Sequence, residues 1–545
     1  MKKILFPLIL GIMVPISAFG QQAPADLILF NGKVFTADPA HLYAQAIAIR
    51  GERIIAVGTS AEIAVLGGPK TRRIDLEGRL VIPGINDAHY HHTPDPPGYR
   101  LQFNSLEPGW QEVLDALGNA IKQTPEGTWI FGSIGSAVVA DPQATRFALD
   151  HIAPDHPVLL RAFYLHGYII NSKAMTALGI TDEEPDPMAG YFERVSGSKR
   201  ITGKSFEYAD WQLSRRLAST VSDEEAIKSM RAFADEAVRY GITSVQNMSF
   251  LPAGRYVHLL TKARLPIRIR VIRFPMTSVR GRDLTEGRNL PLHPRWSPLV
   301  TVNGTKWILD GTPLERGAAL RRAYRDRPGW SGRLNFSAEE IASMIREALA
   351  RKDQLLVHCA GDKPVEVLFN AMEGISSKVD WAKMRVRIEH GDGVIGDLIP
   401  RARRLGVVVV QNPSHFTFTE ILHSRYGADI QFLPLRSLLD ARIPLAFGSD
   451  GPLNPYLNIM FAVIHPARPT EAITLEQAIE AYTRGSAFAE HAEQEKGSIV
   501  KGKLADLAVL SQDIFTVTIT ELPKTQSLLT IIGGKLVYDA GVLKQ

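Results

Sequence analysis

The feature that most restricts the fold of this chain is a regular alternation of short apolar segments and amphipathic segments through its middle. The apolar segments have the length of buried strands and the segments between them have helical spacing, which is the pattern of βα units. The expected strands are 80–89, 242–246, 267–272, 300–308, 354–358, 386–390, 407–411 and 444–448. Eight such units predict an α/β fold, a (β/α)8 TIM barrel.

The chain is longer than such a barrel requires, because it has 545 residues and a plain barrel needs about 250. We expect a long insertion, at about 95–235, after strand 1. Both ends of the chain are rich in β signals, including an expected hairpin at 26–36 around Asn31-Gly32. Segments 21–82 and 491–545 are predicted to form one small composite β-sandwich, and 83–490 the barrel.

The first twenty residues have the composition of a secretory signal peptide. Lys2 and Lys3 precede an apolar stretch from Ile4 to Ile16. The alternative is a membrane anchor, but the stretch is short for a span and contains two prolines. We therefore expect export to the periplasm or beyond, without stable membrane association. The net charge of +5 includes two leader lysines, and no basic run follows, so no nucleic-acid partner is expected.

Four histidines stand at the carboxyl ends of expected strands, the face of a barrel that carries active sites. His89 and His91 lie two residues apart at the end of the first strand, so both imidazoles can share one face. His358 and His390 end the fifth and sixth strands. Taken singly, each is more easily explained as a surface or partnered core histidine. Together they predict a metal site at the barrel mouth.

Two further residues extend this prediction. Asp450 follows the eighth strand, where a carboxylate can ligate a metal and accept a proton; a helix N-cap is the alternative. Lys306 lies among apolar residues of the fourth strand, and a buried ammonium is costly unless it is paired. A salt bridge to Asp310 would explain it. Carboxylation by CO₂ would instead make it an anionic metal ligand.

These residues lie in stretches that resemble a known family. Segment 83–91 resembles the PGxxDxHxH signature of the amidohydrolase superfamily, and 306–311, 357–363, 388–390 and 448–452 are similar to its amidohydrolase 3 branch, which includes N-substituted formamide deformylases. The resemblance implies a distorted barrel with a composite β-sandwich and one or two divalent ions, commonly zinc. The resemblance also implies a role for each candidate residue: metal ligands for His89, His91, His358 and His390, a bridge between two ions for a carboxylated Lys306, and a proton shuttle for Asp450.

The resemblance also singles out His166 and Asn171, which match a pattern expected near the substrate; a loop turn and a helix cap are the alternatives. The expected activity is hydrolysis of a C–N bond other than a peptide bond, in a small amide, N-formyl, N-acyl or cyclic amide. Metal-bound hydroxide would attack, with Asp450 moving the proton. A peptidase, a deaminase or an ester or lactone hydrolase could use the same site. An exported binding protein without activity is a more distant alternative, and an oligomer is compatible with the sequence.

Overall fold

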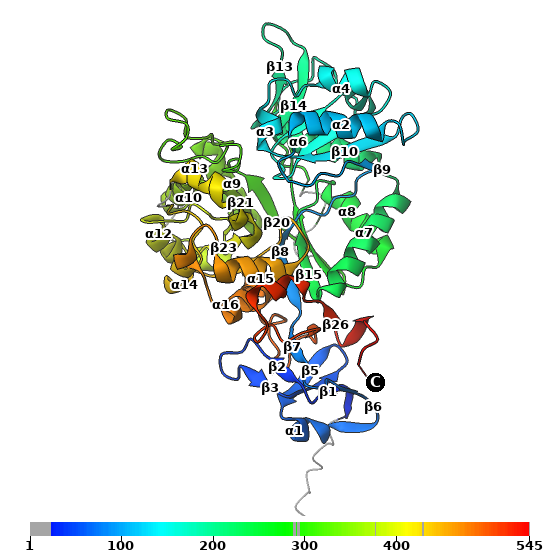
Figure 1. The fold of residues 1–545 in the computed structure, drawn as a ribbon. Coiled ribbons are helices and arrows are strands. Elements are labelled where there is room, and N and C mark those ends of the chain that lie inside the picture. Colours follow the sequence, from blue (N-terminus) through cyan, green and yellow to red (C-terminus); the bar gives the residue numbers. More distant parts are fainter. Residues whose placement is uncertain (1–22, 287–289, 291–294, 376–377, 428–429, 544–545) are drawn as a thin grey trace, which may run out of the picture.

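The computed structural model describes residues 23–286, 290, 295–375, 378–427 and 430–543, so the predicted signal peptide, 1–20, lies outside the described residues. Three parts follow one another along the molecule (Figure 1): a β-rich end built from both termini, a central barrel, and an inserted unit at the opposite end. Within the described part of the chain, no helix combines the length and apolar character needed to cross a bilayer.

The central sheet has eight parallel strands that follow chain order around a nearly closed barrel. They are β8 (Ile85–Tyr90), β15 (Ile242–Asn247), β16 (Arg268–Arg273), β20 (Val300–Ile308), β21 (Leu355–Cys359), β22 (Arg387–His390), β23 (Val408–Gln411) and β24 (Leu445–Phe447). The first and last strands meet where the amide N–H of Asp450 donates to the carbonyl of His89, at 3.1 Å. The predicted barrel is confirmed.

Helices surround the sheet, as the alternation predicted. They include α7 (Asp223–Arg239), α8 (Ala253–Ala263), α9 (Ala338–Arg351), α10 (Asp362–Ile375), α11 (Trp381–Met384), α12 (Leu398–Leu405), α13 (Thr419–Tyr426), α14 (Arg436–Asp440), α15 (Pro455–Ile464), α16 (Leu475–Glu480) and α17 (Ser486–Ala489). Ser337 begins α9 with a capping box, in which its hydroxyl accepts from the amide N–H of Glu340. Between β16 and β20 the described residues form short strands instead: β17 (Thr277–Ser278), β18 (Gly281–Arg282) and β19 (Arg295–Ser297).

The expected first strand, 80–89, is two strands in the structure. β7 (Leu80–Pro83) pairs with terminal strands, whereas β8 begins the barrel. Gly84 separates them, and a Cβ at this position would lie 2.3 Å from the side chain of Thr243. The apolar pattern runs unbroken through both strands, so it gave no sign that the chain passes from one sheet to another.

The two ends of the chain form one composite unit. One sheet has the order β27-β26-β25-β7-β2-β3 and mixes both termini, and the other has the order β5-β4-β1-β6. Their bounds are β1 (Ala25–Phe30), β2 (Lys33–Phe35), β3 (Tyr43–Ala44), β4 (Ala46–Arg50), β5 (Arg53–Gly58), β6 (Gly67–Asp75), β25 (Leu507–Leu510), β26 (Ser527–Ile532) and β27 (Lys535–Asp539). Leu29, Ile47, Leu507 and Leu529 share one buried core between them. The predicted composite sandwich is confirmed.

The hairpin expected around Asn31-Gly32 is wrong. β1 pairs with β4 and β6, whereas β2 pairs with β3 and β7, so the turn carries the chain from one sheet to the other. Asn31 has a φ of 57° there, which suits a tight turn of either kind. Local turn chemistry marks a reversal of direction, and only the packing of both sheets decides which strands pair.

The insertion after β8 is a mixed sheet with the order β13-β14-β12-β11-β10-β9. Its elements are β9 (Gly98–Arg100), α2 (Trp110–Ala120), β10 (Trp129–Ile134), α3 (Ser136–Ala140), α4 (Arg146–Ile152), β11 (Val158–Ala162), β12 (Tyr168–Ile170), α5 (Ser172–Ala177), β13 (Gly190–Arg194) and β14 (Ile201–Glu207). The chain returns through α6 (Tyr208–Thr220) to α7, which packs on β15. The loop after β11 places Phe163 against Phe418 of the barrel, with ring centroids 5.3 Å apart.

Candidate active site

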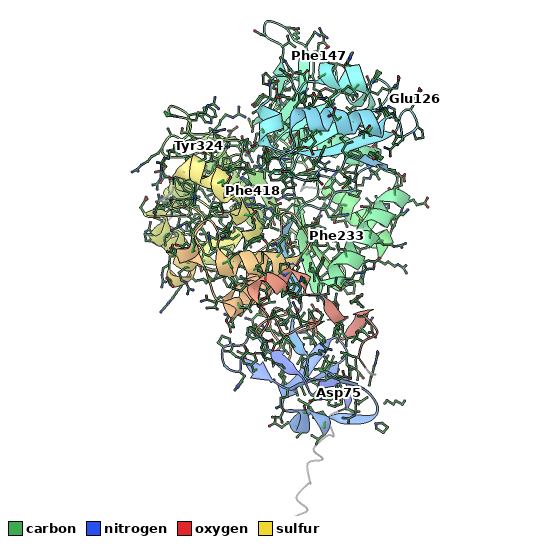
Figure 2. The ribbon with its side chains drawn as sticks, viewed as in Figure 1. Asp75, Glu126, Phe147, Phe233, Tyr324 and Phe418 are labelled. Carbon is green, nitrogen blue, oxygen red and sulfur yellow. The ribbon has the colours of Figure 1, made fainter. Side chains whose placement is uncertain are left out.

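A cavity of about 470 Å³ lies at the mouth of the barrel, between the strand ends and the insertion. Its polar wall includes His91, His166, Lys306, His358, His390, Asp392, His415 and Asp450. The rest is mostly apolar and aromatic, with Phe163 and Trp211 from the insertion side facing Phe250, Phe274 and Phe418. Phe418, labelled in Figure 2, lies where the barrel meets the insertion. The arrangement suits a small, largely apolar ligand held beside a few polar groups.

The protonation of His89 and His91 follows from what their Nδ1 atoms contact. Nδ1 of His89 lies 2.6 Å from a carboxylate oxygen of Glu389, and Nδ1 of His91 lies 2.8 Å from the carbonyl oxygen of Met248. Because a carboxylate and a carbonyl accept, each Nδ1 carries the proton and donates. Both Nε2 atoms are then left with lone pairs, and they face each other at 3.2 Å.

Two opposed lone pairs at this distance repel each other unless a positive charge lies between or beside them. Either the ammonium of Lys306, 3.0 and 3.4 Å from the two Nε2 atoms, or a metal ion would supply that charge. A tetrahedral zinc ion with Zn–N bonds of about 2.0–2.1 Å sets two nitrogen ligands about 3.3 Å apart. The separation observed between the two histidines matches this value. An oxygen of Asp450 lies 3.7 Å from Nε2 of His89 and 3.8 Å from Nε2 of His91. These three side chains therefore form a group that fits a divalent ion.

Lys306 lies directly beside this group. Its Nζ is 3.0 Å from Nε2 of His89 and 3.4 Å from Nε2 of His91. Burial lowers the pKa of Lys306 to about 8, although Glu389 and Asp450 act in the opposite direction. A larger fraction of the amine is therefore neutral near physiological pH than in an exposed lysine, and carboxylation requires a neutral amine.

The alternative partner of Lys306, Asp310, is engaged elsewhere. Its carboxylate accepts from the backbone N–H groups of Ala319, Ala360 and Gly361, at 2.8 to 3.1 Å. Among the described residues, the ion-pair contact of Asp310 is with Nε2 of His358, at 3.7 Å, and not with Lys306. Burial raises the pKa of Asp310 to about 8 despite those three donors. The Nζ of Lys306 therefore contacts the histidines. The carboxylate of Asp310 instead accepts hydrogen bonds from the backbone of the neighbouring loops.

Asp450 also faces a second set of histidines. Its other oxygen lies 3.8 Å from Nε2 of His390 and 3.9 Å from Nε2 of His415. The sequence analysis did not identify His415 as a candidate ligand. The signal for it was its position, because it follows the expected seventh strand by four residues, near the strand ends that carry the other candidate ligands. His358 is close to His390, with ring centroids 4.4 Å apart, but its Nε2 lies 3.3 Å from the carbonyl oxygen of Gly311.

Asp450 does not cap the helix that follows it. The N-cap of α15 is Asn454, whose side chain accepts from the amide N–H groups of the first turn. Asp450 has a φ of 39° and His390 a φ of 66°, conformations that cost a non-glycine residue about 1–3 kcal/mol and that cluster at functional sites. Burial acts to raise the pKa of Asp450, but the histidines around it and the nearby Lys306 hold that pKa well below its usual range. The carboxylate is therefore ionised at neutral pH.

Comparison with known proteins agrees with this geometry. A model of the amidohydrolase family matches residues 72–538. The chain belongs to the amidohydrolase family. Among curated relatives of this amidohydrolase, it is 26% identical to an N-substituted formamide deformylase of Arthrobacter pascens, over 94% of this chain and 98% of that protein. It is also 26% identical to the putative amidohydrolase YtcJ of Bacillus subtilis (strain 168), over 87% of this chain and 92% of that protein.

Solved structures agree on the fold. An uncharacterized metal-dependent hydrolase from Pyrococcus horikoshii OT3 superposes with a TM-score of 0.69 at 20% identity, covering 91% of this chain and 99% of that one. One from Pyrococcus furiosus gives a TM-score of 0.66 at 24% identity, covering 89% and 99%. The chain is accordingly a hydrolase of the amidohydrolase family, and the donors at its barrel mouth are those of a metal-dependent enzyme.

Glu389 orients the first histidine of this amidohydrolase. Besides accepting from His89, its carboxylate accepts from Nε of Arg387 at 2.8 Å and from Nη2 at 3.0 Å, and both side chains are fully buried. A carboxylate behind a ligating histidine fixes the tautomer and raises the basicity of the ligand nitrogen. The sequence held a signal for this pair, because Arg387 and Glu389 alternate with apolar Ile388 along a buried strand and so share one face.

The insertion contributes His166 to the cavity of the amidohydrolase, next to His358, with ring centroids 5.2 Å apart. Its Nδ1 lies 2.8 Å from Glu207, whose second oxygen accepts from Asn335 at 2.7 Å. Burial would lower the pKa of His166, but Glu207 outweighs it and raises that pKa to about 9. Glu207 has a φ of 57° and a ψ of −130°, a strained backbone at the junction of insertion and barrel.

Asn171, which was expected near the substrate with a helix cap as the alternative, does not line the cavity. Asn171 is fully buried away from the cavity lining, and its side chain accepts from the amide N–H of Ala174 at the start of α5. Its amide nitrogen donates to the carbonyl oxygens of Ala153 and His156. Every polar atom of the side chain is therefore used within the insertion, which is the helix-cap alternative.

Proposed function

We propose that this amidohydrolase cleaves a C–N bond outside a peptide, in a small amide, N-formyl, N-acyl or cyclic amide substrate. One observation carries the proposal. The Nε2 atoms of His89 and His91 face each other at 3.2 Å with both Nδ1 protons committed elsewhere, and the Asp450 carboxylate lies within 3.8 Å of both. A divalent ion and an ionised carboxylate side by side are the parts that metal-assisted hydrolysis needs.

The candidate ligands would divide between two positions. His89, His91 and Asp450 would hold one ion, and His390 and His415 with the second oxygen of Asp450 would help to hold another. His358 would join the second position by turning away from Gly311. A carboxylated Lys306 would bridge the two, because its nitrogen already lies beside the first pair. Zinc is the proposed metal, since imidazole nitrogen and carboxylate oxygen are among its usual ligands.

When bound, a divalent ion would supply hydroxide at neutral pH, by lowering the pKa of water towards about 7, and would polarise the scissile carbonyl. Asp450 is placed to accept the proton of the attacking water, because it is ionised and borders the cavity. The same carboxyl group then returns that proton to the departing nitrogen, which could not leave as an amide anion. The aromatic wall would exclude bulk water from these steps.

The choice of an amide draws support from the relatives as well as the site. The Arthrobacter pascens relative is named for removing a formyl group from N-substituted formamides, and the match spans nearly both chains. The apolar lining, including Phe250, Phe274 and Phe418, suits an organic substituent on the amide nitrogen. A peptidase, a deaminase and an ester or lactone hydrolase are the activities against which the proposal is tested.

The test is a substrate panel with zinc-loaded protein that lacks residues 1–20. The panel compares N-alkylformamides and N-acyl amines with dipeptides, aminopurines, alkyl esters and lactones, and release of amine, ammonia or acid is measured for each. The proposal expects the highest kcat/KM for formamides or other N-acyl amines. Turnover confined to dipeptides, aminopurines or esters would replace it with the corresponding activity. Absence of turnover from the whole panel, with zinc bound, would contradict amide hydrolysis as its function.

A further inference from the structure

One carboxylate in the wall of the cavity has no partner in the described part of the chain. Asp392 follows β22, two residues after His390, and only 7% of its surface is exposed. No described group donates a hydrogen bond to its side chain or forms an ion pair with it, although it lines the cavity. By contrast, the carboxylate of Asp450 lies within 4 Å of four histidines, and the carboxylate of Glu389 forms an ion pair with Arg387.

An unpaired buried carboxylate is expensive, because burial removes water from the charge without replacing its hydrogen bonds. Local structure does not account for the side chain. The loop is held by its backbone, since the amide N–H of Leu433 donates to the carbonyl oxygen of Asp392 at 2.9 Å. Asp392 is also outside the groups of described residues that fit a metal.

The rest of the lining indicates which charge the cavity accepts. Lys306 is the one lysine among the lining residues of the described chain, it lies at the metal ligands, and no arginine lines the cavity there. Carboxylates of ligands are commonly bound by arginine. A substrate with a free carboxylate would therefore find no lysine or arginine away from the metal ligands, and the imidazole of His166 in the wall is already paired with Glu207. The apolar part of the wall includes Leu314, Leu422 and Leu433.

We infer that Asp392 determines specificity by binding an ammonium group of the substrate, so that the preferred substrates are amides that carry a second, basic nitrogen. This inference rests on the proposed amide hydrolysis. The apolar wall holds the hydrocarbon chain of such a substrate, the metal ligands surround its amide, and the carboxylate of Asp392 accepts hydrogen bonds from its distal ammonium. N-acyl amino acids and other amides with a free carboxylate are poor substrates for the same reason.

The experiment uses zinc-loaded protein and matched formamides. A series of N-formyl diamines of increasing chain length is compared with N-alkylformamides, in which a methyl group replaces the ammonium, and with N-formyl amino acids that end in a carboxylate. At the best chain length, kcat/KM for the ammonium compound should exceed that of its methyl isostere by about 10- to 100-fold, the range for a hydrogen bond to a charged group. The carboxylate compound should be the slowest. Equal values for the ammonium and methyl compounds at every length would overturn the inference.

Variants of Asp392 show whether this residue recognises the ammonium group of the substrate or only maintains the structure of the site. Asp392→Asn should bring the ammonium-to-methyl ratio of kcat/KM close to one, and Asp392→Glu should restore part of the preference. Glu420→Gln, an exposed position on α13, is the matched control and should keep the parent ratio. If Asp392→Asn slows both compounds by one common factor, or loses zinc, the residue supports the site and the inference is wrong.

A binding measurement distinguishes failure of this inference from failure of the proposed function. Calorimetric titration with free diamines and with alkylamines of equal length requires no turnover. Tighter binding of the diamine to the parent than to Asp392→Asn, without hydrolysis of any amide, would support the cation site and contradict amide hydrolysis. Hydrolysis of N-alkylformamides with equal binding of both amines would support the proposed function and contradict the role of Asp392.

Discussion

Nδ1 of His89 donates to the Glu389 carboxylate across 2.6 Å, although the two residues lie on β8 and β22, strands that do not pair with each other. The contact therefore joins two barrel strands that are not neighbours in the sheet. It turns Nε2 of His89 towards His91 and holds it there. The strength of metal binding should therefore depend on a residue that is not itself a ligand.

We predict that Glu389→Gln weakens zinc binding by about 10- to 100-fold, the usual effect of losing a partner behind a ligating histidine. Glutamine can still accept from Nδ1, but it does not carry the charge that Arg387 also contacts. Zinc affinity is measured by competition with a chelator, and thermal unfolding shows whether the change also destabilises the barrel. Unaltered zinc affinity in a folded variant would contradict the orienting role.

For Lys306 we predict that bicarbonate controls the amount of metal bound. Loading with excess zinc in bicarbonate buffer should give two ions per chain if the amine is carboxylated, and CO₂-depleted buffer should give fewer. Lys306→Arg is the control, because a guanidinium keeps its charge and forms no such adduct under these conditions. Elemental analysis after dialysis gives the count. The same metal content in both buffers would contradict the bridging role of Lys306. Substantially less than one ion per chain in both buffers would contradict the metal site itself.

Asp450→Asn should lower kcat by about 10²–10⁴-fold, the range for losing general acid–base catalysis. Folding should survive, because Asn454 and not Asp450 caps α15. Zinc is counted on the sample used for kinetics. A fall in rate with zinc retained supports the proton-transfer role, whereas zinc loss in proportion to activity would assign Asp450 mainly to metal binding. Near-normal turnover would exclude it from the mechanism.

The His166–Glu207 pair predicts a pH-dependent contribution to stability. The pKa of His166 is raised to about 9 in the folded protein, above its ordinary value of about 6.5. The pair therefore stabilises the fold fully below pH about 6.5, and its contribution is lost as the pH rises through about 9. Glu207→Gln should lower the Tm more near neutral pH than above pH 9, and thermal unfolding at both values tests this. An equal loss at both would show that the ion pair contributes no pH-dependent stability.

Export is a separate prediction, because the leader lies outside the described residues. Protein made in a secreting host should begin near Gln21 and be recovered in the soluble fraction outside the cytoplasm. Intact-mass measurement identifies the first residue. Retention of residues 1–20, or recovery only with membranes, would favour the anchor alternative.

Much of the barrel could be predicted because its strands are local patterns. Each apolar run has strand length and is followed by a helical spacing, and a strand alternates its faces, which places His89 and His91 together without knowledge of the fold. The same reasoning failed where a pattern was continuous or ambiguous. Segment 80–89 runs through two sheets, and Asn31-Gly32 connects sheets instead of closing a hairpin.

The sequence by itself determined the kind of fold and which residue types end the barrel strands, because both depend on residues near one another in the chain. Tertiary structure alone decided the partners: Glu389 behind His89, His415 beside Asp450, and Asp392 without any described partner in the cavity wall. It also decided that Asn171 caps a helix. These outcomes depend on how strands far apart in sequence close into one barrel, since a hydrogen bond or an unpaired charge is defined by atoms that only folding brings within a few ångströms.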